Sequence, residues 1–226
     1  MTQHVAGTPY TTEAARTEFD SWSRRYDWDP LQLLFFKPTH RMLLKHVRAS
    51  DRRLLDVGCG TGVFAQRALE QFSNLHVVGM DLSAGMLRGA EKRVAAARGR
   101  LQVVQGDSEV LPFADNAFDV VTCSHSFHHY PNQERVVAEM HRVLRPGGRV
   151  LIADGDRDRA WGHFVFDGVV VMMEGAVVHR SAASMRDIYH GAGFGEVHQE
   201  RRGGVAPFLI TLGHAIKPVG VLRRAA

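Results

Sequence analysis

The sequence has little of several features that define other classes of protein. It contains two cysteines in 226 residues, too few for a disulfide framework or a cysteine-rich zinc site. No apolar run is long enough to cross a bilayer, and the first ten residues lack the basic-then-apolar order of a signal peptide. The formal charge of +4 comes without a dense block of lysine and arginine. These absences predict a cytoplasmic protein with no membrane span and no nucleic-acid partner.

The chain does have enough apolar residues to build one core. Hydrophobic residues make up 45% of the sequence and charged residues 23%. At this length and composition a single domain over residues 1–226 is expected. No internal repeat or low-complexity linker divides it.

The stretch Leu54–Ala65, LLDVGCGTGVFA, organises the rest of the chain. It begins with an apolar run that predicts a buried strand and ends with a segment that predicts a helix. Between them Gly58, Gly60 and Gly62 predict a sharp turn that leaves room for a ligand. The start of the helix would offer N–H groups and the positive end of its dipole. We therefore expect a small-molecule site at the carboxyl end of the first strand.

Features missing from this stretch narrow the choice of ligand. A dinucleotide-binding turn would have a third glycine where Val63 stands, and a P-loop would have a lysine followed by serine or threonine. Asp56, two residues before the first glycine, would repel a pyrophosphate but attract an ammonium group. A nicotinamide oxidoreductase is therefore disfavoured, and a glycine-rich turn without a ligand is the alternative.

A second acid follows the next expected strand, at residues 75–80. Asp81 falls about 20 residues beyond the glycines, where dinucleotide folds place the residue that binds ribose hydroxyls. A carboxylate can accept two hydrogen bonds from a vicinal diol, so this position suits the adenosine part of a cofactor. Capping of the helix expected over 83–98 is an alternative role, compatible with the first.

Two passages resemble class I S-adenosylmethionine-dependent methyltransferases. One is the glycine stretch, and the other, LPFADNAFDVV at residues 111–121, is similar to the family's passage from the adenine loop to the fourth strand. The resemblance covers roughly residues 22–154 well and the rest weakly, and it is to the group that methylates small molecules in ubiquinone and menaquinone biosynthesis. It implies a doubly wound α/β fold with a seven-stranded, mostly parallel sheet in the order 3-2-1-4-5-7-6, the last strand antiparallel.

The resemblance also implies S-adenosylmethionine as the cofactor. In the family, the acid that matches Asp81 binds the ribose hydroxyls, and the acid that matches Asp107 accepts a hydrogen bond from the adenine amine. Met86 could reach the adenine, and a role in the core is an equal alternative. The cofactor-binding residues expected on this basis are Asp56, Gly58, Cys59, Gly60, Gly62, Asp81, Leu82, Met86, Asp107, Ser108, Glu109, Ser124 and Tyr26.

Two flanking segments are expected to complete the site. Residues 11–48 form an N-terminal helical segment whose aromatic residues, Tyr26 among them, resemble the family's lid over the cofactor; anchoring a helix to the core is the alternative. Residues 155–192 are expected to form a helical insertion near the acceptor. Its stretch 161–178 is almost wholly apolar, so it should pack against the lid, a second copy of the chain in a homodimer, or an apolar acceptor.

Three histidines follow the expected fourth strand, at the edge where a substrate would meet the methyl group. His125, His128 and His129 are candidate catalytic residues, because an unperturbed histidine titrates near neutral pH and can take a proton from the acceptor. No metal is expected, since no carboxylate or cysteine stands nearby at the usual ligand spacing. Packing beneath the lid is the alternative for any one of them.

The expected function is methyl transfer from S-adenosylmethionine to a small, partly apolar metabolite, by in-line displacement at the sulfonium methyl. Because the sulfonium carries an excellent leaving group, the enzyme has to align the reactants, exclude water and, where needed, remove a proton from the acceptor. A protein that binds S-adenosylmethionine without catalysis, as a regulator or partner subunit, is the alternative. A nucleic-acid methyltransferase is disfavoured because residues 124–127 lack an Asn/Asp-Pro-Pro-aromatic tetrad. Carbon, oxygen, nitrogen and sulfur all stay open as the methylated atom.

Overall fold

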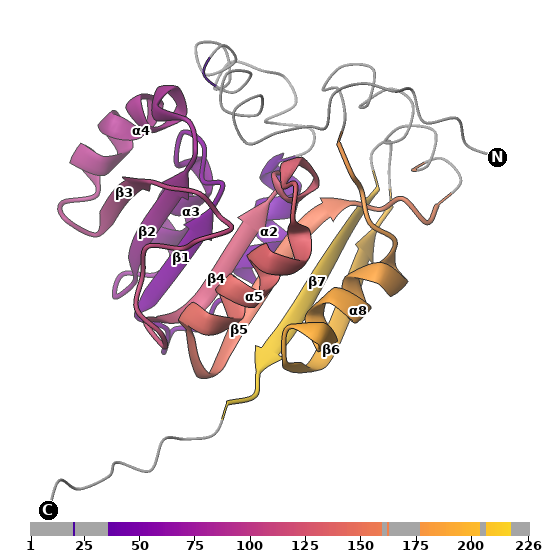
Figure 1. Ribbon diagram of the computed structural model, residues 1–226. Coiled ribbons are helices and arrows are strands. Elements are labelled where there is room, and N and C mark those ends of the chain that lie inside the picture. Colours follow the sequence, from indigo (N-terminus) through magenta and orange to yellow (C-terminus); the bar gives the residue numbers. More distant parts are fainter. Residues whose placement is uncertain (1–19, 21–35, 160–161, 163–176, 204–206, 218–226) are drawn as a thin grey trace, which may run out of the picture.

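The computed structural model describes residues 20, 36–159, 162, 177–203 and 207–217 (Figure 1). In that part of the chain seven strands form one sheet in the order β3-β2-β1-β4-β5-β7-β6, which confirms the predicted fold. The strands are β1 (Arg53–Val57), β2 (His76–Asp81), β3 (Leu101–Gln105), β4 (Phe118–Ser124), β5 (Leu144–Gly155), β6 (Phe194–Arg202) and β7 (Phe208–Ala215). The helices are α2 (Lys37–Leu44), α3 (Val63–Gln71), α4 (Ala84–Ala96), the short 3₁₀ helix η3 (Phe127–His129), α5 (Gln133–Val143) and α8 (Ala182–Gly191).

The pairing of the strands decides where a site can form. Strands β1 to β5 pair in parallel, and β7 runs antiparallel to both β5 and β6. The parallel strands therefore end at one edge of the sheet, called here the carboxyl edge. The strand order reverses between β1 and β4, and such a reversal is where open α/β sheets bind their ligands. The glycine turn after β1 and the histidines after β4 consequently lie next to each other.

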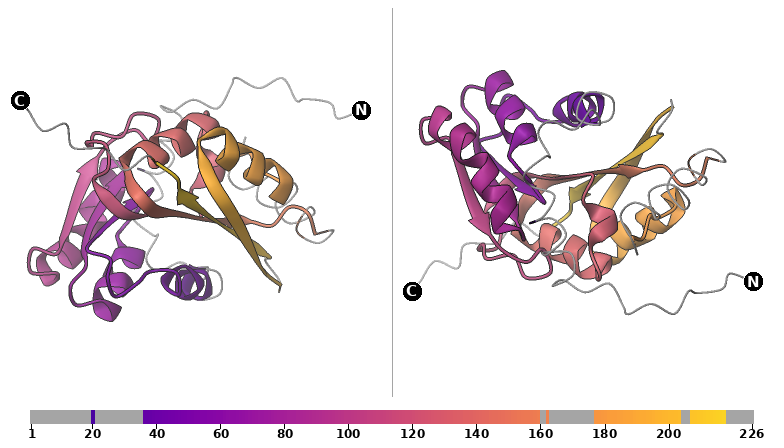
Figure 2. Two further views of the ribbon diagram at one scale, coloured as in Figure 1. Left: turned by 90° about the horizontal axis from the view of Figure 1, so that it is seen from below. Right: turned by 90° about the horizontal axis from the view of Figure 1, so that it is seen from above.

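Helices cover both faces of the sheet, with α2, α3 and α4 on one face and α5 and α8 on the other (Figure 2). Neighbouring residues of β1 illustrate the alternation of side chains along a strand: Leu54 packs in the cluster with α3, and Leu55 in the cluster with α5. Both faces are thus buried, which is why the strands read as apolar runs. None of the described helices has the length and apolar character needed to span a membrane.

Serine and asparagine side chains begin the helices where the sequence changes from strand to helix. Ser83 caps α4, Asn132 caps α5 and Ser181 caps α8, each accepting a hydrogen bond from a main-chain N–H group three residues ahead, at 3.1 Å. Ser83, not Asp81, is therefore the cap of α4. This corrects the alternative role considered for Asp81.

The N-terminal segment is described in part. Within residues 11–48, helix α2 begins at Lys37 with a proline in its first turn, a position that proline favours. Asp20 lies at the start of α4, where its Oδ1 accepts hydrogen bonds from Ser83 Oγ and from the Gly85 N–H group, the latter at 2.9 Å. Tyr26 falls outside the described residues, and the lid stays a prediction.

The predicted insertion over residues 155–192 is also described in part. Helix α8 lies at its end. The Val178 N–H group donates a main-chain hydrogen bond to the His128 carbonyl of η3 at 2.9 Å, and the insertion as a whole stays a prediction. The end of the insertion therefore returns to the carboxyl edge. Most of the apolar stretch 161–178 lies outside the described residues.

Candidate active site at the carboxyl edge

The glycine turn connects β1 to α3 in a backbone conformation that glycine adopts readily. The φ angles of Gly58, Gly60 and Gly62 are 70°, 55° and 78°, all in the left-handed region. The N–H groups of Gly58 and Cys59 donate to the Met80 carbonyl at 2.8 and 3.0 Å. These bonds fix the turn to the end of β2 before the chain enters α3.

Gly58 is also where the turn approaches the segment after β4. A Cβ atom at this position would overlap Ser126 Oγ and lie 2.6 Å from Tyr130 Oη. Ser126 Oγ lies 3.0 Å from Tyr130 Oη and 3.1 Å from Cys123 Sγ, so the three side chains form a polar cluster against the glycine. Sequence reasoning missed Ser126 and Tyr130, because nothing in their spacing relates them to a turn far earlier in the chain.

Two further glycines, on β2 and α4, leave room for side chains of the turn. A Cβ atom on Gly79 of β2 would lie 2.8 Å from Cys59 Sγ, and one on Gly89 of α4 would lie 2.8 Å from Thr61 Cγ2. The side chains of Cys59 and Thr61 are buried in the space that these glycines leave. The thiol of Cys59, a residue predicted to bind the cofactor, therefore packs against β2. Its N–H group donates to Met80 and its carbonyl accepts from the Gly62 N–H group, so its contact with a cofactor stays a prediction.

Asp81, at the end of β2, points into the glycine turn. Its Oδ2 accepts a hydrogen bond from the Gly60 N–H group at 2.8 Å, and its Oδ1 accepts one from the Ser83 N–H group at 2.9 Å. Burial raises the pKa of Asp81, although both hydrogen bonds act in the opposite direction. The structure thus brings the predicted ribose-binding acid and the predicted cradle together, although they are separated by 21 positions in the chain.

Asp56 lies beneath the turn and is 2% exposed. Its carboxylate accepts a hydrogen bond from Thr122 Oγ1, on the neighbouring strand β4, at 2.8 Å. Burial raises the pKa of Asp56 to about 7, against the effect of the Thr122 hydrogen bond, and the nearby Asp81 raises it further. A carboxyl group with this pKa changes its charge near neutral pH. Its attraction for the ammonium group of a ligand stays a prediction.

The residues expected around the adenine follow β3 and begin α4. Asp107 Oδ1 accepts a hydrogen bond from the Glu109 N–H group at 2.9 Å, which shapes the loop that also carries Ser108. Leu82 continues directly from β2. Met86 is buried in α4, which favours its role in the core. Contacts of these residues with a cofactor stay predictions.

His125 and Ser124 come at the end of β4. The His125 ring packs 4.7 Å from the Phe36 ring and 4.7 Å from the Phe208 ring, measured between centroids. Burial lowers the pKa of His125 to about 3, so it is neutral at pH 7 and a weak base. His125 Nε2 and Ser124 Oγ are buried and have no hydrogen-bond partner within the described ranges.

His129 and His128 lie side by side, with ring centroids 4.2 Å apart. Burial lowers the pKa of His129 well below its ordinary value, and the neighbouring His128 adds to this effect. His128 is distinguished by a carboxylate: its Nδ1 lies 2.6 Å from Asp154 Oδ1, at the end of β5. Asp154 therefore orients the ring of His128, one of the three predicted bases.

Asp154 and His179 were not predicted as site residues. His179 Nε2 lies 3.8 Å from the same Asp154 Oδ1, and the His179 ring stacks on His128 with centroids 4.4 Å apart. Burial raises the pKa of Asp154, but His128 outweighs it and the net shift is downward. The argument against a metal, that no carboxylate stands near the histidines, is therefore corrected. The strands bring Asp154 to His128 although 26 positions separate them.

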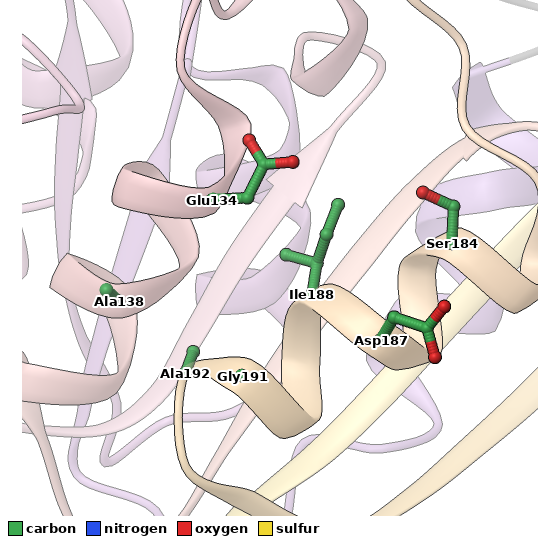
Figure 3. A pocket seen from close by; sticks show the side chains of 7 residues that line it. All are labelled: Glu134, Ala138, Ser184, Asp187, Ile188, Gly191 and Ala192. Atoms are coloured by element: carbon green, nitrogen blue, oxygen red, sulfur yellow. The ribbon is translucent and has the colours of Figure 1, made fainter.

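A groove of about 390 Å³ lies apart from this edge, between α5 and α8 (Figure 3). It is lined by Glu134, Ala138, Ser184, Asp187, Ile188, Gly191 and Ala192. Neither the glycine turn nor the histidine cluster contributes to it. We therefore place the candidate site at the carboxyl edge and not in this groove.

A family model matches the part of the chain that carries the glycine turn. Residues 55–152 match the family model described as a methyltransferase domain, which runs from β1 into β5. This region is therefore similar to that methyltransferase family. It contains Asp56, the three glycines of the turn, Asp81 and the histidines after β4.

Curated relatives are similar to the chain in sequence, and solved structures share its fold. The chain is 38% identical over 105 residues to a demethylmenaquinone methyltransferase of Deinococcus radiodurans, covering 46% of this chain and 44% of the relative. It is 38% identical over 142 residues to a ubiquinone/menaquinone biosynthesis C-methyltransferase of Methylobacterium nodulans. This match covers 59% of this chain and 56% of the relative. The chain thus spans about half the length of these curated relatives. A Thermotoga maritima structure, described as an S-adenosylmethionine-dependent methyltransferase, shares the fold with a TM-score of 0.70 and 21% identity, covering 88% of this chain and 99% of that one.

Proposed function

We propose that this protein transfers the methyl group of S-adenosylmethionine to a small, partly apolar acceptor. The observation that carries the proposal is the hydrogen bond from the Gly60 N–H group to Asp81 Oδ2. It places an acid from the end of β2 inside a left-handed glycine turn from the end of β1, at the strand reversal where such folds bind their ligands. The matched methyltransferase family supports the same cofactor.

The residues of the site fit the parts of this cofactor. Its amino-acid end carries both charges, which suits the N–H groups at the start of α3 together with the Asp56 carboxyl group beneath the turn. Its ribose diol suits Asp81, because each carboxylate oxygen has two lone pairs and the two main-chain hydrogen bonds occupy one on each. A dinucleotide would instead bring a pyrophosphate close to Asp56.

S-adenosylmethionine supplies a methyl group on a sulfonium, an excellent leaving group, so in-line displacement requires no covalent bond to the protein. The chain has to hold the acceptor in line and keep water out. Phe36 and Phe208 would form an aromatic wall at the end of β4, because both rings pack against His125. His128, oriented by Asp154, is the histidine on which activation of an acceptor hydroxyl would depend.

We further propose a quinol-type aromatic acceptor. The aromatic wall supports an apolar ring, and the hydroxyl groups of a quinol would face His128. Both curated relatives are described as enzymes of menaquinone or ubiquinone methylation. A strongly charged, hydrophilic best substrate would contradict this choice of acceptor.

The test of the cofactor is a calorimetric titration of the full chain with S-adenosylmethionine and NAD side by side. We expect binding of the first and none of the second. Asp81→Ala should weaken binding by about 1.5–3 kcal/mol, because charge-assisted hydrogen bonds to the ribose are lost. The matched control is Asp187→Ala, an exposed acid on α8, which should bind like the wild type. Equal affinity in all three proteins would overturn the assignment.

The test of the acceptor is a methyl-transfer assay with demethylated quinols and with hydrophilic amines, each supplied with labelled S-adenosylmethionine. Label transferred to a quinol supports the proposal. A protein that binds S-adenosylmethionine tightly but transfers the label to no acceptor would favour the non-catalytic alternative.

A further inference from the structure

His128, Asp154 and His179 come together at the carboxyl edge, from η3, β5 and the segment before α8. One ligand-type atom from each lies within 4.8 Å of the other two. The side chains are 8%, 13% and 1% exposed, respectively. Two imidazole nitrogens therefore converge on one carboxylate in a place that is nearly closed to solvent.

The main chain holds the two histidines together independently of their rings. The Val178 N–H group donates to the His128 carbonyl at 2.9 Å. Gln133 of α5 reinforces the contact, because its Nε2 donates to the Val178 carbonyl at 2.9 Å while its Oε1 accepts from Arg180 Nε at 2.5 Å. The site is thus built on a fixed frame, as a binding site for a small ion requires.

The carboxylate is held as well. Asp154 Oδ1 accepts a hydrogen bond from the Gly155 N–H group at 2.8 Å. Hydrogen bonds of this kind orient ligating carboxylates in metal sites. The direction of all three donor groups is therefore set by the fold.

We propose that His128, Asp154 and His179 bind one divalent transition-metal cation of the zinc class. Two imidazoles and one carboxylate suit zinc or iron(II) better than magnesium or calcium. Ligand atoms at about 2.0–2.2 Å from a tetrahedral ion lie about 3.3–3.6 Å apart. The separations of 2.6 and 3.8 Å from Asp154 Oδ1 fall on either side of this range. Three protein ligands leave a position open, as in catalytic zinc sites.

The open position would take an oxygen atom of the methyl acceptor, and this part rests on the proposed function. A hydroxyl bound to the cation has a lowered pKa and gives its proton to solvent. The oxyanion, or a carbon conjugated to it, then forms the bond to the methyl group while the carbon–sulfur bond breaks and the sulfonium becomes a neutral thioether. The main-chain N–H group of His125, at the end of β4, donates to the Ala153 carbonyl at 2.9 Å, and Ala153 directly precedes Asp154. The proposed metal site is therefore next to the end of β4, where we expect the acceptor.

The binding test uses the full chain after treatment with a chelator, in the absence of cofactor and acceptor. Zinc is titrated by calorimetry, and cobalt(II) is followed by its visible absorption. We expect one ion per chain. Asp154→Asn and His179→Gln should each weaken binding by more than about 100-fold, since the loss of an outer-shell partner alone costs 10–100-fold.

The matched control is His198→Gln on β6. His198 Nε2 lies 3.5 Å from Glu196 Oε2, but both side chains are exposed, so this variant should bind zinc like the wild type. Circular dichroism and thermal unfolding establish that each variant is folded. A protein with no saturable zinc or cobalt site, or with a site that survives both Asp154→Asn and His179→Gln, would overturn the metal proposal.

The role in catalysis is tested separately by methyl transfer. Protein treated with a chelator should lose turnover and regain it with one equivalent of zinc or iron(II). Its affinity for S-adenosylmethionine should stay unchanged. Full turnover without metal would overturn the acceptor role. Because metal binding is measured without cofactor, its failure is distinguishable from a failure of the proposed methyl transfer.

Discussion

On the cofactor side of the carboxyl edge, main-chain atoms make most of the contacts that shape the site. The turn is held by N–H groups of Gly58, Cys59 and Gly60 that reach the end of β2. On the acceptor side, side chains from separate elements do this work, as His128, Asp154 and His179 show. A site shaped by main chain depends on residues that permit a conformation, whereas a site shaped by side chains depends on residues that carry chemical groups. Substitutions on the cofactor side and on the acceptor side should therefore have different effects on binding and turnover.

The largest effect is expected on the cofactor side. Gly60→Val should abolish binding of S-adenosylmethionine, because valine strongly disfavours the left-handed conformation at φ 55° and fills the cradle. Calorimetric titration measures this. Gly191→Ala is the control, since a Cβ atom there meets nothing within 4 Å. Wild-type affinity in Gly60→Val would contradict the view that the cofactor side depends on its main-chain conformation.

The next effect is expected on the acceptor side. His128→Ala should lower turnover by on the order of 10²–10⁴ while the affinity for S-adenosylmethionine stays unchanged. Steady-state kinetics together with calorimetry check both statements. His125→Ala and His129→Ala should have smaller effects on turnover, because burial lowers the pKa of both rings. If all three variants keep full turnover, no histidine activates the acceptor.

A third prediction concerns the stability of the cofactor side. The folded state raises the pKa of Asp56 from an ordinary value of 3.8 to about 7. Its contribution to stability is therefore complete below pH 3.8 and is lost as the pH rises through 7. At 1.36 kcal/mol per pH unit the loss approaches about 4 kcal/mol. Asp56→Asn should remove this loss. The free energy of unfolding of the variant, relative to that of the wild type, should therefore be higher at pH 8 than at pH 4.

Chemical denaturation of both proteins across this pH range gives the free energies of unfolding. A constant difference between them would show that Asp56 does not titrate in this window. The same group should couple to the cofactor. An ammonium group beside Asp56 favours the ionised carboxylate, so the affinity for S-adenosylmethionine should rise with pH through 7 in the wild type but not in Asp56→Asn.

The smallest effect concerns the anchoring of the acceptor side. Ser181→Ala should lower the free energy of unfolding by about 1 kcal/mol, because α8 loses the side-chain hydrogen bond to its Ser184 N–H group. Ser184→Ala, in the same turn, is the control and should cost less. Affinity for S-adenosylmethionine should not change in either variant. A loss of that affinity would mean that the two halves are coupled.

The sequence was sufficient to predict the sheet order and the glycine turn, the first from a resemblance and the second from local spacing. A turn of three glycines is encoded within a few residues, and Asp81 follows directly from the strand beside it. Asp154 lies at the end of β5 in the same manner, and it was missed because ligand spacing was counted along the chain. Strands β4 and β5 are paired, with Ser124 opposite Ala153, so this acid lies beside the histidines.

His179 could not have been predicted in this way. It comes from the end of a long insertion, and the Val178 N–H group and Gln133 bring it back to η3. Ser126 and Tyr130 are a similar case. They come close to Gly58 only because β1 and β4 are neighbours where the strand order reverses. Such relations depend on tertiary packing, which a local pattern does not encode.

The contact between Gly58 and the polar cluster restricts how the protein could be redesigned. A library that varies the segment after β4 to change the acceptor would include Ser126 and Tyr130, yet these two side chains define the space against Gly58. Larger residues there would press on the cofactor turn and reduce affinity for the methyl donor. His125 is therefore the better position to randomise first, with residues 58, 126 and 130 left unchanged together.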